Sequence, residues 1–220
     1  YPKLLLKTKI FFLNIIFIQA QVYTFQTNQN GKRVTHRILM DQSYLVETQF
    51  VSDPPEFILT RGGFYSKEGE AFIVNFEFNS NFEKDGIKQL VMNRSKDWTK
   101  TSKKTMDLNG KWLMAGRMTD QGQQRRDISR PRKTMKFLLD GYFQWIAFNT
   151  ETLDFFGSGG GYYTTENGKY TEHIEYFSRD NSRVGAVLPF EYSLKGSDWH
   201  HQGFSSKGDP MHEIWSLRIQ

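Results

Sequence analysis

The side chains with the clearest chemical potential lie on short apolar segments in the second half of the chain. His173 and Glu175 are two residues apart, so on a β-strand they project from one face, where they could bind a metal or orient a polar ligand. A satisfied hydrogen-bond network lining a barrel is the alternative, because buried polar groups normally have partners. His200 and His201 are adjacent and face opposite sides of a strand, so at most one of them can join His173.

A metal centre or a covalent mechanism is not expected. Zinc needs three or four convergent donors, and His212 is the only further histidine in this half. The chain has no cysteine, which excludes disulfides, thiol catalysis and cysteine-ligated metals. No Gly-x-Ser-x-Gly hydrolase motif is present. We therefore predict no catalytic residue, no metal and no cofactor; acid–base catalysis by Glu175 and a histidine is the enzymatic alternative.

Cationic and aromatic side chains indicate what else this half could bind. Residues 125–133 hold four arginines and one lysine. Arg132 follows Pro131 at the start of an expected strand, so we expect it to turn inward and attract an anionic group; a solvated loop is the alternative. Five aromatic residues could line a ligand cavity or equally fill a solid core: Phe143, Trp145, Tyr162, Tyr170 and Trp199. The net charge of +5, without a nucleic-acid-binding motif, argues against a nucleic-acid partner.

The segments that carry these residues occur twice. Gly62-Gly63-Phe64-Tyr65 returns as Gly160-Gly161-Tyr162-Tyr163, an offset of 98 residues. Phe76-Glu77-Phe78 returns at the same offset as Ile174-Glu175-Tyr176. Two related units of about 100 residues follow, the usual size of a small domain. We assign residues 21–105 to the first unit and 106–220 to the second.

The second unit predicts eight or nine short strands separated by turns. In the segment 133–139, Met135 and Phe137 share one face, and Thr134 and Lys136 share the other. An antiparallel meander of this length is expected to close into a barrel, because closure removes exposed edges. The glycine run 157–161 separates two expected strands, and we interpret it as a bend or a close approach of backbones.

The first unit repeats the early strands and then runs short. Trp98 corresponds either to Trp199 or to Trp215; in the second case the unit lacks a hairpin, stays open and needs cover from the second unit. Before it, residues 1–20 combine a basic start with a short apolar run. That pattern predicts a signal peptide cleaved after Ala20, with a buried strand or an uncleaved anchor as the alternative.

The second unit opens with Leu108-Asn109-Gly110-Lys111-Trp112, and this Gly-x-Trp resembles the lipocalin signature. In that family the Trp closes one end of the barrel and an Arg from the last strand packs over it. The resemblance implies these roles for Trp112 and Arg218. Longer stretches, such as 124–127, 143–147, 170–175 and 199–201, resemble exported lipocalin-like proteins of Gram-negative bacteria, usually labelled "membrane or secreted protein". The resemblance implies a calycin-type barrel and a periplasmic or secreted location, and it brings no activity.

These observations predict an all-β protein of two tandem lipocalin-like antiparallel barrel units, the C-terminal one complete and the N-terminal one reduced. The expected function is non-catalytic binding of a small apolar or amphipathic molecule in the C-terminal barrel. The expected contact residues are Arg132, Phe143, Trp145, Tyr162, Tyr170, His173, Glu175, Trp199 and His200. A cell-envelope interaction module with a solid core and no ligand is the alternative. No membrane-spanning segment is expected in the mature chain, and the sequence indicates no particular oligomeric state.

Overall fold

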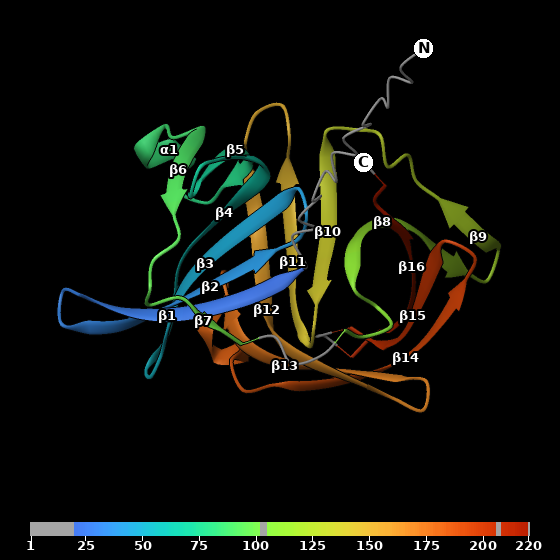
Figure 1. Ribbon diagram of the computed structural model, residues 1–220. Helices are drawn as coiled ribbons and strands as arrows, with labels where there is room; N and C mark the ends of the chain where they lie inside the picture. The colour runs from blue at the N-terminus through green and yellow to red at the C-terminus, as the bar shows by residue number, and fades with distance from the viewer. Residues whose placement is uncertain (1–19, 102–104, 206–207, 220) are drawn as a thin grey trace, which may run out of the picture.

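The computed structural model describes residues 20–101, 105–205 and 208–219. The expected signal peptide lies, except for Ala20, outside these residues. The described chain is almost entirely strand and forms two antiparallel sheets, seen side by side in Figure 1. Besides strands it contains the short helix α1 (Phe82–Asp85) and the 3-10 turn η1 (Asn181–Arg183). Neither has the length or apolarity to cross a membrane.

The first sheet has the order β6-β5-β4-β3-β2-β1-β7 and remains open. Its edge strands β6 and β7 do not pair with each other, so the first unit is a half-barrel, as predicted for a reduced repeat. Its strands are β1 (Gln21–Gln29), β2 (Lys32–Met40), β3 (Tyr44–Ser52), β4 (Pro55–Glu68), β5 (Ala71–Asn79), β6 (Gln89–Asn93) and β7 (Thr99–Lys100).

The second sheet closes into an eight-stranded barrel, which confirms the predicted fold class. Closure comes from β10, which pairs with β11 on one side and with β8 on the other, where Lys136 lies opposite Trp112. β9 lies outside the ring and extends β8 as a hairpin. The strands are β8 (Gly110–Thr119), β9 (Gly122–Arg125), β10 (Arg132–Leu139), β11 (Tyr142–Asn149), β12 (Phe155–Glu166), β13 (Lys169–Phe177), β14 (Val187–Lys195), β15 (Asp198–Phe204) and β16 (Pro210–Leu217).

The half-barrel packs against the outer wall of the barrel. Leu39, Tyr44 and Phe78 of the first sheet form one buried cluster with Phe137 and Phe148 of the second. The other face of the first sheet holds a separate cluster, which Trp98 covers by stacking on the rings of nearby aromatic residues. β2 and β3 are consequently buried on both faces. The first unit therefore obtains from the second the cover that an open sheet requires.

The repeat is preserved down to a β-bulge in each unit. Register shifts occur between Gly62 and Gly63 in the β4–β5 pair, and between Gly160 and Gly161 in the β12–β13 pair. A Cβ atom on Gly161 would lie 1.9 Å from the carbonyl oxygen of His173, so only glycine allows β12 and β13 to approach this closely. The glycine run therefore lies inside one long strand, β12, and does not separate two strands as expected.

Candidate functional site

The barrel contains a cavity of about 750 Å³ at the end where β8 stops and β16 begins. Its volume falls in the range of small-molecule sites. The apolar part of its lining includes Met118, Phe190, Phe204 and Met211. Phe204 is 64% exposed, so an apolar surface faces solvent at this end of the barrel.

Phe190 separates the cavity from the barrel interior. It lines the cavity, it belongs to the buried cluster that fills the lumen, and its ring centroid lies 4.1 Å from that of His201. Gly203 makes room for this ring, because a Cβ atom there would come within 2.7 Å of Phe190 Cδ1. The middle of the barrel is filled by aromatic side chains, so the open volume is confined to one end.

A buried ion pair lies behind Phe190. Lys136 Nζ is 2.6 Å from Glu172 Oε1, and the Tyr170 hydroxyl donates to the same oxygen at 2.9 Å. All three residues are buried. Four rings surround the ammonium group at 5.3–5.7 Å and add cation–π attraction: those of Tyr170, Phe190, Trp199 and Trp215. Aromatic side chains of the same chain thus form a cage around the lysine ammonium group.

His201 lies beside this pair and is held neutral. Burial, followed by the charge of Lys136, lowers its pKa to about 4. Its Nδ1 is 3.4 Å from Glu213 Oε2, which also accepts a hydrogen bond from Trp215 Nε1 at 3.1 Å. Burial favours a higher pKa for Glu213, but the bond to His201 and the charge of Lys136 outweigh it and lower that pKa. Glu213 is therefore an anion, and Nδ1 of His201 carries the ring proton.

Two polar atoms in this interior have no hydrogen-bond partner among the described residues: His201 Nε2 and Trp199 Nε1. Both residues are fully buried, and their ring centroids are 5.2 Å apart. Because His201 is neutral with its proton on Nδ1, Nε2 presents a lone pair, while the indole Nε1 presents a donor. Buried polar groups normally have partners, so this pair requires an explanation.

The predicted contact residues divide between the two sides of the barrel wall. Phe143, Tyr170 and Trp199 are buried in the interior, and Trp145 packs against the same cluster. The lumen therefore contains four of the nine. Their role in binding remains a prediction, because none of the four lines the open cavity directly.

Three of the other predicted residues lie on the outer surface. Tyr162 is 44% exposed and stacks on His173, with ring centroids 4.3 Å apart. His200 lies next to the buried Trp199 and so projects outward, where its Nδ1 is 3.0 Å from Nε2 of His212. Within the described residues, no three histidine or carboxylate side chains converge in a way that could hold a metal ion.

Glu175 lies on the outer side of the barrel wall, as His173 does, so these two residues do not face the lumen. Glu175 is the extra residue of the β13 bulge, and the bulge interrupts the alternation at this point. Its carboxylate forms a bidentate ion pair with Arg37 of β2, whose guanidinium is fully buried between the two units. Glu175 therefore joins the two sheets and does not face the lumen.

Arg218 also departs from the role that the lipocalin resemblance implied. It donates two hydrogen bonds to Glu77 of the first unit, at 2.7 and 2.8 Å, and lies over the rings of Tyr44 and Phe64. Trp112 instead donates its indole N–H to the Leu108 carbonyl at 2.8 Å. Glu77 is the bulge residue of β5 and the repeat counterpart of Glu175, so each unit contributes one glutamate to an arginine of the other.

The basic stretch forms part of the outer surface. Arg132 does not turn inward: it is exposed, and its guanidinium carbon lies 3.9 Å from the centroid of the Phe156 ring. Arg179 donates to the Phe156 carbonyl oxygen from the same side. Burial and the charges of Arg126 and Arg179 lower the pKa of Arg132, as expected when guanidinium groups gather.

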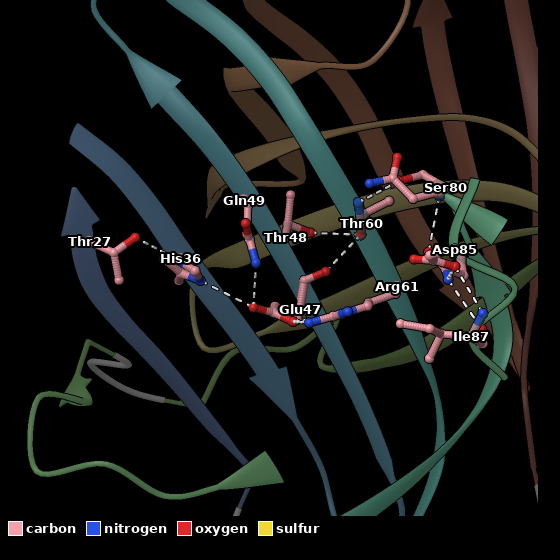
Figure 2. A network of polar contacts seen from close by, with 12 residues as sticks. Thr27, His36, Glu47, Thr48, Gln49, Thr60, Arg61, Ser80, Asp85 and Ile87 are labelled. Atoms are coloured by element: carbon pink, nitrogen blue, oxygen red, sulfur yellow. Dashed lines mark hydrogen bonds and ion pairs between the residues drawn. The ribbon is translucent and has the colours of Figure 1, made fainter. Parts of the chain in front are cut away.

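The first sheet holds a second polar network, shown in Figure 2. Glu47 accepts from His36 Nδ1 at 3.1 Å, from Gln49 at 2.9 Å and from Arg61 Nε at 2.9 Å, and His36 Nε2 contacts the Thr27 hydroxyl at 2.9 Å. Burial opposes ionisation of Glu47, but the bond to His36 and the charge of Arg61 lower its pKa to about 2. This carboxylate is fully compensated.

The order hydroxyl, imidazole, carboxylate is that of an activated nucleophile. Two contacts argue against that role here. Gln29 Nε2 also donates to the Thr27 hydroxyl at 3.2 Å, and the Phe25 ring stacks on His36 with centroids 4.4 Å apart. The chain's own side chains cover both flanks of the Thr27–His36 pair, so we assign the network a structural role.

Sequence reasoning missed Lys136, Glu172, His201 and Glu213. For His201 the signal was present, because it is two residues from Trp199 and must share its face. His200, adjacent to Trp199, lies on the opposite face by the same alternation. For Lys136, the alternation in β10 separates it from Met135 and Phe137, but the alternation alone does not show which face is the inner one. Met135 and Phe137 in fact pack against the first sheet, and Lys136 faces the lumen.

Comparison with known families matches one model, described as "Domain of unknown function (DUF4488)", to residues 107–220. The matched region contains the whole barrel and extends over more than half of the chain. A search of curated proteins finds no match.

Proposed function

The chain belongs to the DUF4488 family, and we propose that its C-terminal barrel is a non-catalytic binding module for a small apolar or amphipathic molecule. The observation that carries the proposal is the cavity of about 750 Å³ at one end of the barrel, where apolar surface predominates in a lining that also includes charged residues. Met118 and Phe204 expose apolar surface there, which is unfavourable in water unless something covers it. The lipocalin-like character of the barrel supports the same function by analogy only, since a fold hosts many functions.

Binding of an uncharged fluorescent probe tests this proposal. N-phenyl-1-naphthylamine should bind one-to-one and saturably, with a dissociation constant on the order of micromolar. Met211→Trp places a large side chain in the cavity and should weaken binding at least about tenfold. Leu194→Trp, an exposed position on β14 outside the cavity lining, is the matched control and should leave affinity unchanged. Equal weakening by both variants, or no saturable binding, would contradict the proposal.

The basic face favours a second function, an interaction module for an anionic partner surface. Arg132 and Arg179 contact Phe156, and Arg126 lies close enough to Arg132 to lower its pKa. Within the described residues none of the three arginines forms an ion pair. Sedimentation with vesicles of anionic and of zwitterionic lipid tests this function. Binding restricted to anionic vesicles and lost in Arg132→Ala/Arg179→Ala would support it. Identical behaviour of the two lipids would remove it.

We further propose that the chain is exported by its N-terminal segment. The support is the sequence pattern alone: lysines at positions 3, 7 and 9, an apolar run and a small residue at position 20. Strand β1 begins at Gln21, directly after the expected cleavage point. N-terminal sequencing of protein recovered from the cell envelope or medium should begin at Gln21; a retained segment 1–20 would refute cleavage.

A further inference from the structure

We propose that the barrel contains an inner subsite, behind Phe190, that accepts the hydroxyl group of a neutral amphipathic ligand through His201 Nε2 and Trp199 Nε1. This inference rests on the proposed binding function and specifies the chemistry of its ligand. The subsite differs from the predicted one, in which Arg132, His173 and Glu175 held the polar end, because those three residues lie outside the lumen.

The first step is the character of the two unpartnered atoms. Nε2 of His201 can only accept a hydrogen bond, because the proton lies on Nδ1 facing Glu213. Nε1 of Trp199 can only donate. A hydroxyl group donates once and accepts, so it is the smallest group of a ligand that satisfies both atoms. An ether oxygen satisfies only Trp199, and an ammonium group satisfies only His201.

The second step is the charge of the interior. Lys136 carries one positive charge, whereas Glu172 and Glu213 carry two negative charges, and His201 is neutral. The lumen is therefore already anionic by one unit. A carboxylate or phosphate entering it would meet this charge and lose its hydration, which is strongly unfavourable. Lys136 offers such an anion little, because Glu172 and four aromatic rings already surround it.

The third step is access. The cavity ends at Phe190, whose ring packs over Gly203 on one side and against His201 on the other. Access of a ligand to His201 therefore requires this single side chain to rotate out of the path between the cavity and the imidazole. Side-chain rotations of this kind are fast compared with ligand binding. The apolar chain of the ligand then remains between Met118, Phe204 and Met211.

Two isomeric ligands provide the test: 1-decanol, which donates and accepts, and methyl nonyl ether, which only accepts. Each is measured by displacement of N-phenyl-1-naphthylamine from the intact protein. The alcohol should bind about tenfold more tightly than the ether, the effect of one additional net hydrogen bond. Decanoate should bind more weakly than the alcohol. His201→Phe should bring the alcohol to the affinity of the ether, and Tyr162→Phe on the outer surface should leave the preference intact.

The outcomes separate the inference from the proposed function. Equal affinity of alcohol and ether, or a preference that survives His201→Phe, would overturn the inner subsite while leaving the cavity as a binding site. Failure of both ligands and the probe to bind would remove the proposed function itself. If His201→Phe does not fold, the nitrogen resonance of His201 Nε2 in the wild-type protein decides. It should shift on addition of the alcohol and stay in place on addition of the ether; an unchanged resonance with bound alcohol would also overturn the subsite.

Discussion

Two single buried side chains, one histidine and one glutamate, make the stability of this protein depend on pH. His201 has a folded pKa of about 4, below its ordinary value of 6.5. Between these values the unfolded chain binds a proton that the folded chain does not, so stability falls as pH is lowered through this range. The depressed pKa corresponds to about 3 kcal/mol.

Chemical denaturation at a series of pH values measures this contribution. In the wild type the free energy of unfolding should decrease from pH 6.5 to pH 4, and His201→Phe should flatten that part of the curve. His200 and His212 also have lowered pKa values, owing to burial and to the charge of Lys195, so some slope should persist in the variant. A variant curve as steep as that of the wild type would show that His201 titrates normally.

Glu47 makes the free energy of unfolding depend on pH in the lower range. The folded protein stabilises its charged form, whereas it favours the neutral form of His201. Its folded pKa of about 2 lies below the ordinary 4.5, so its ion pair and hydrogen bonds stabilise the protein fully above pH 4.5. That stabilisation, about 3 kcal/mol, should be lost as pH falls from 4.5 to 2. Glu47→Gln should make the loss of stability in this range smaller while keeping the side-chain shape, and Glu213, whose pKa is also lowered, should account for part of the remaining slope. The same denaturation series checks it, and an unchanged acid limb would contradict the assignment.

At the level of strands, the two bulges explain both the repeated glycines and the contact between the sheets. Gly161→Ala would place a methyl group within 1.9 Å of a carbonyl oxygen on β13, so one strand backbone must move. We expect a loss of roughly 2 kcal/mol or more in the free energy of unfolding, typical of overpacking at a close backbone approach. Thermal unfolding measures it; Ser66→Ala, on the counterpart strand β4 and away from the bulge, is the control and should have little effect.

The ion pairs made by the two bulge glutamates should contribute more to the free energy of unfolding than exposed ion pairs do. Glu175→Gln leaves the buried guanidinium of Arg37 without its counter-charge, and removing one partner of a buried pair typically costs about 3 kcal/mol. Lys32→Gln breaks the exposed pair with Glu56 and should cost less than about 1 kcal/mol. Equal losses in urea denaturation would mean that Arg37 finds other compensation when Glu175 is neutral.

On the scale of the whole molecule, the shared core makes the two units one folding unit. Leu39, Tyr44 and Phe78 of the first sheet are buried in one cluster with Phe137 and Phe148 of the barrel wall. Separating the sheets would expose this entire surface to water, which is strongly unfavourable. Calorimetry of the chain should therefore show a single transition with equal calorimetric and van't Hoff enthalpies. Two resolved transitions would show that the sheets fold independently.

The same two-sided burial explains which parts of the structure could be predicted. The repeat, the strands and the closed barrel follow from alternation, turn dipeptides and the 98-residue offset, which depend on local sequence. The inner face of β10 could not be identified, because Met135 is buried against the other sheet and Lys136 is buried in the lumen. An apolar face normally marks the interior, but here it marks an interface. The bulge at Glu175 was likewise invisible, since one inserted residue leaves the composition of a strand unchanged.

The indole rings close to one buried ammonium group should make the intrinsic tryptophan fluorescence of the protein sensitive to binding in the barrel. Trp112, Trp199 and Trp215 belong to the cluster inside the barrel, and Lys136 Nζ lies 5.3 Å from the ring centroids of both Trp199 and Trp215. The emission energy of indole follows the electric field and polarity around it. A molecule that displaces Phe190 changes that field. The emission maximum and the lifetime of the intrinsic fluorescence should therefore report binding in the barrel without an added label.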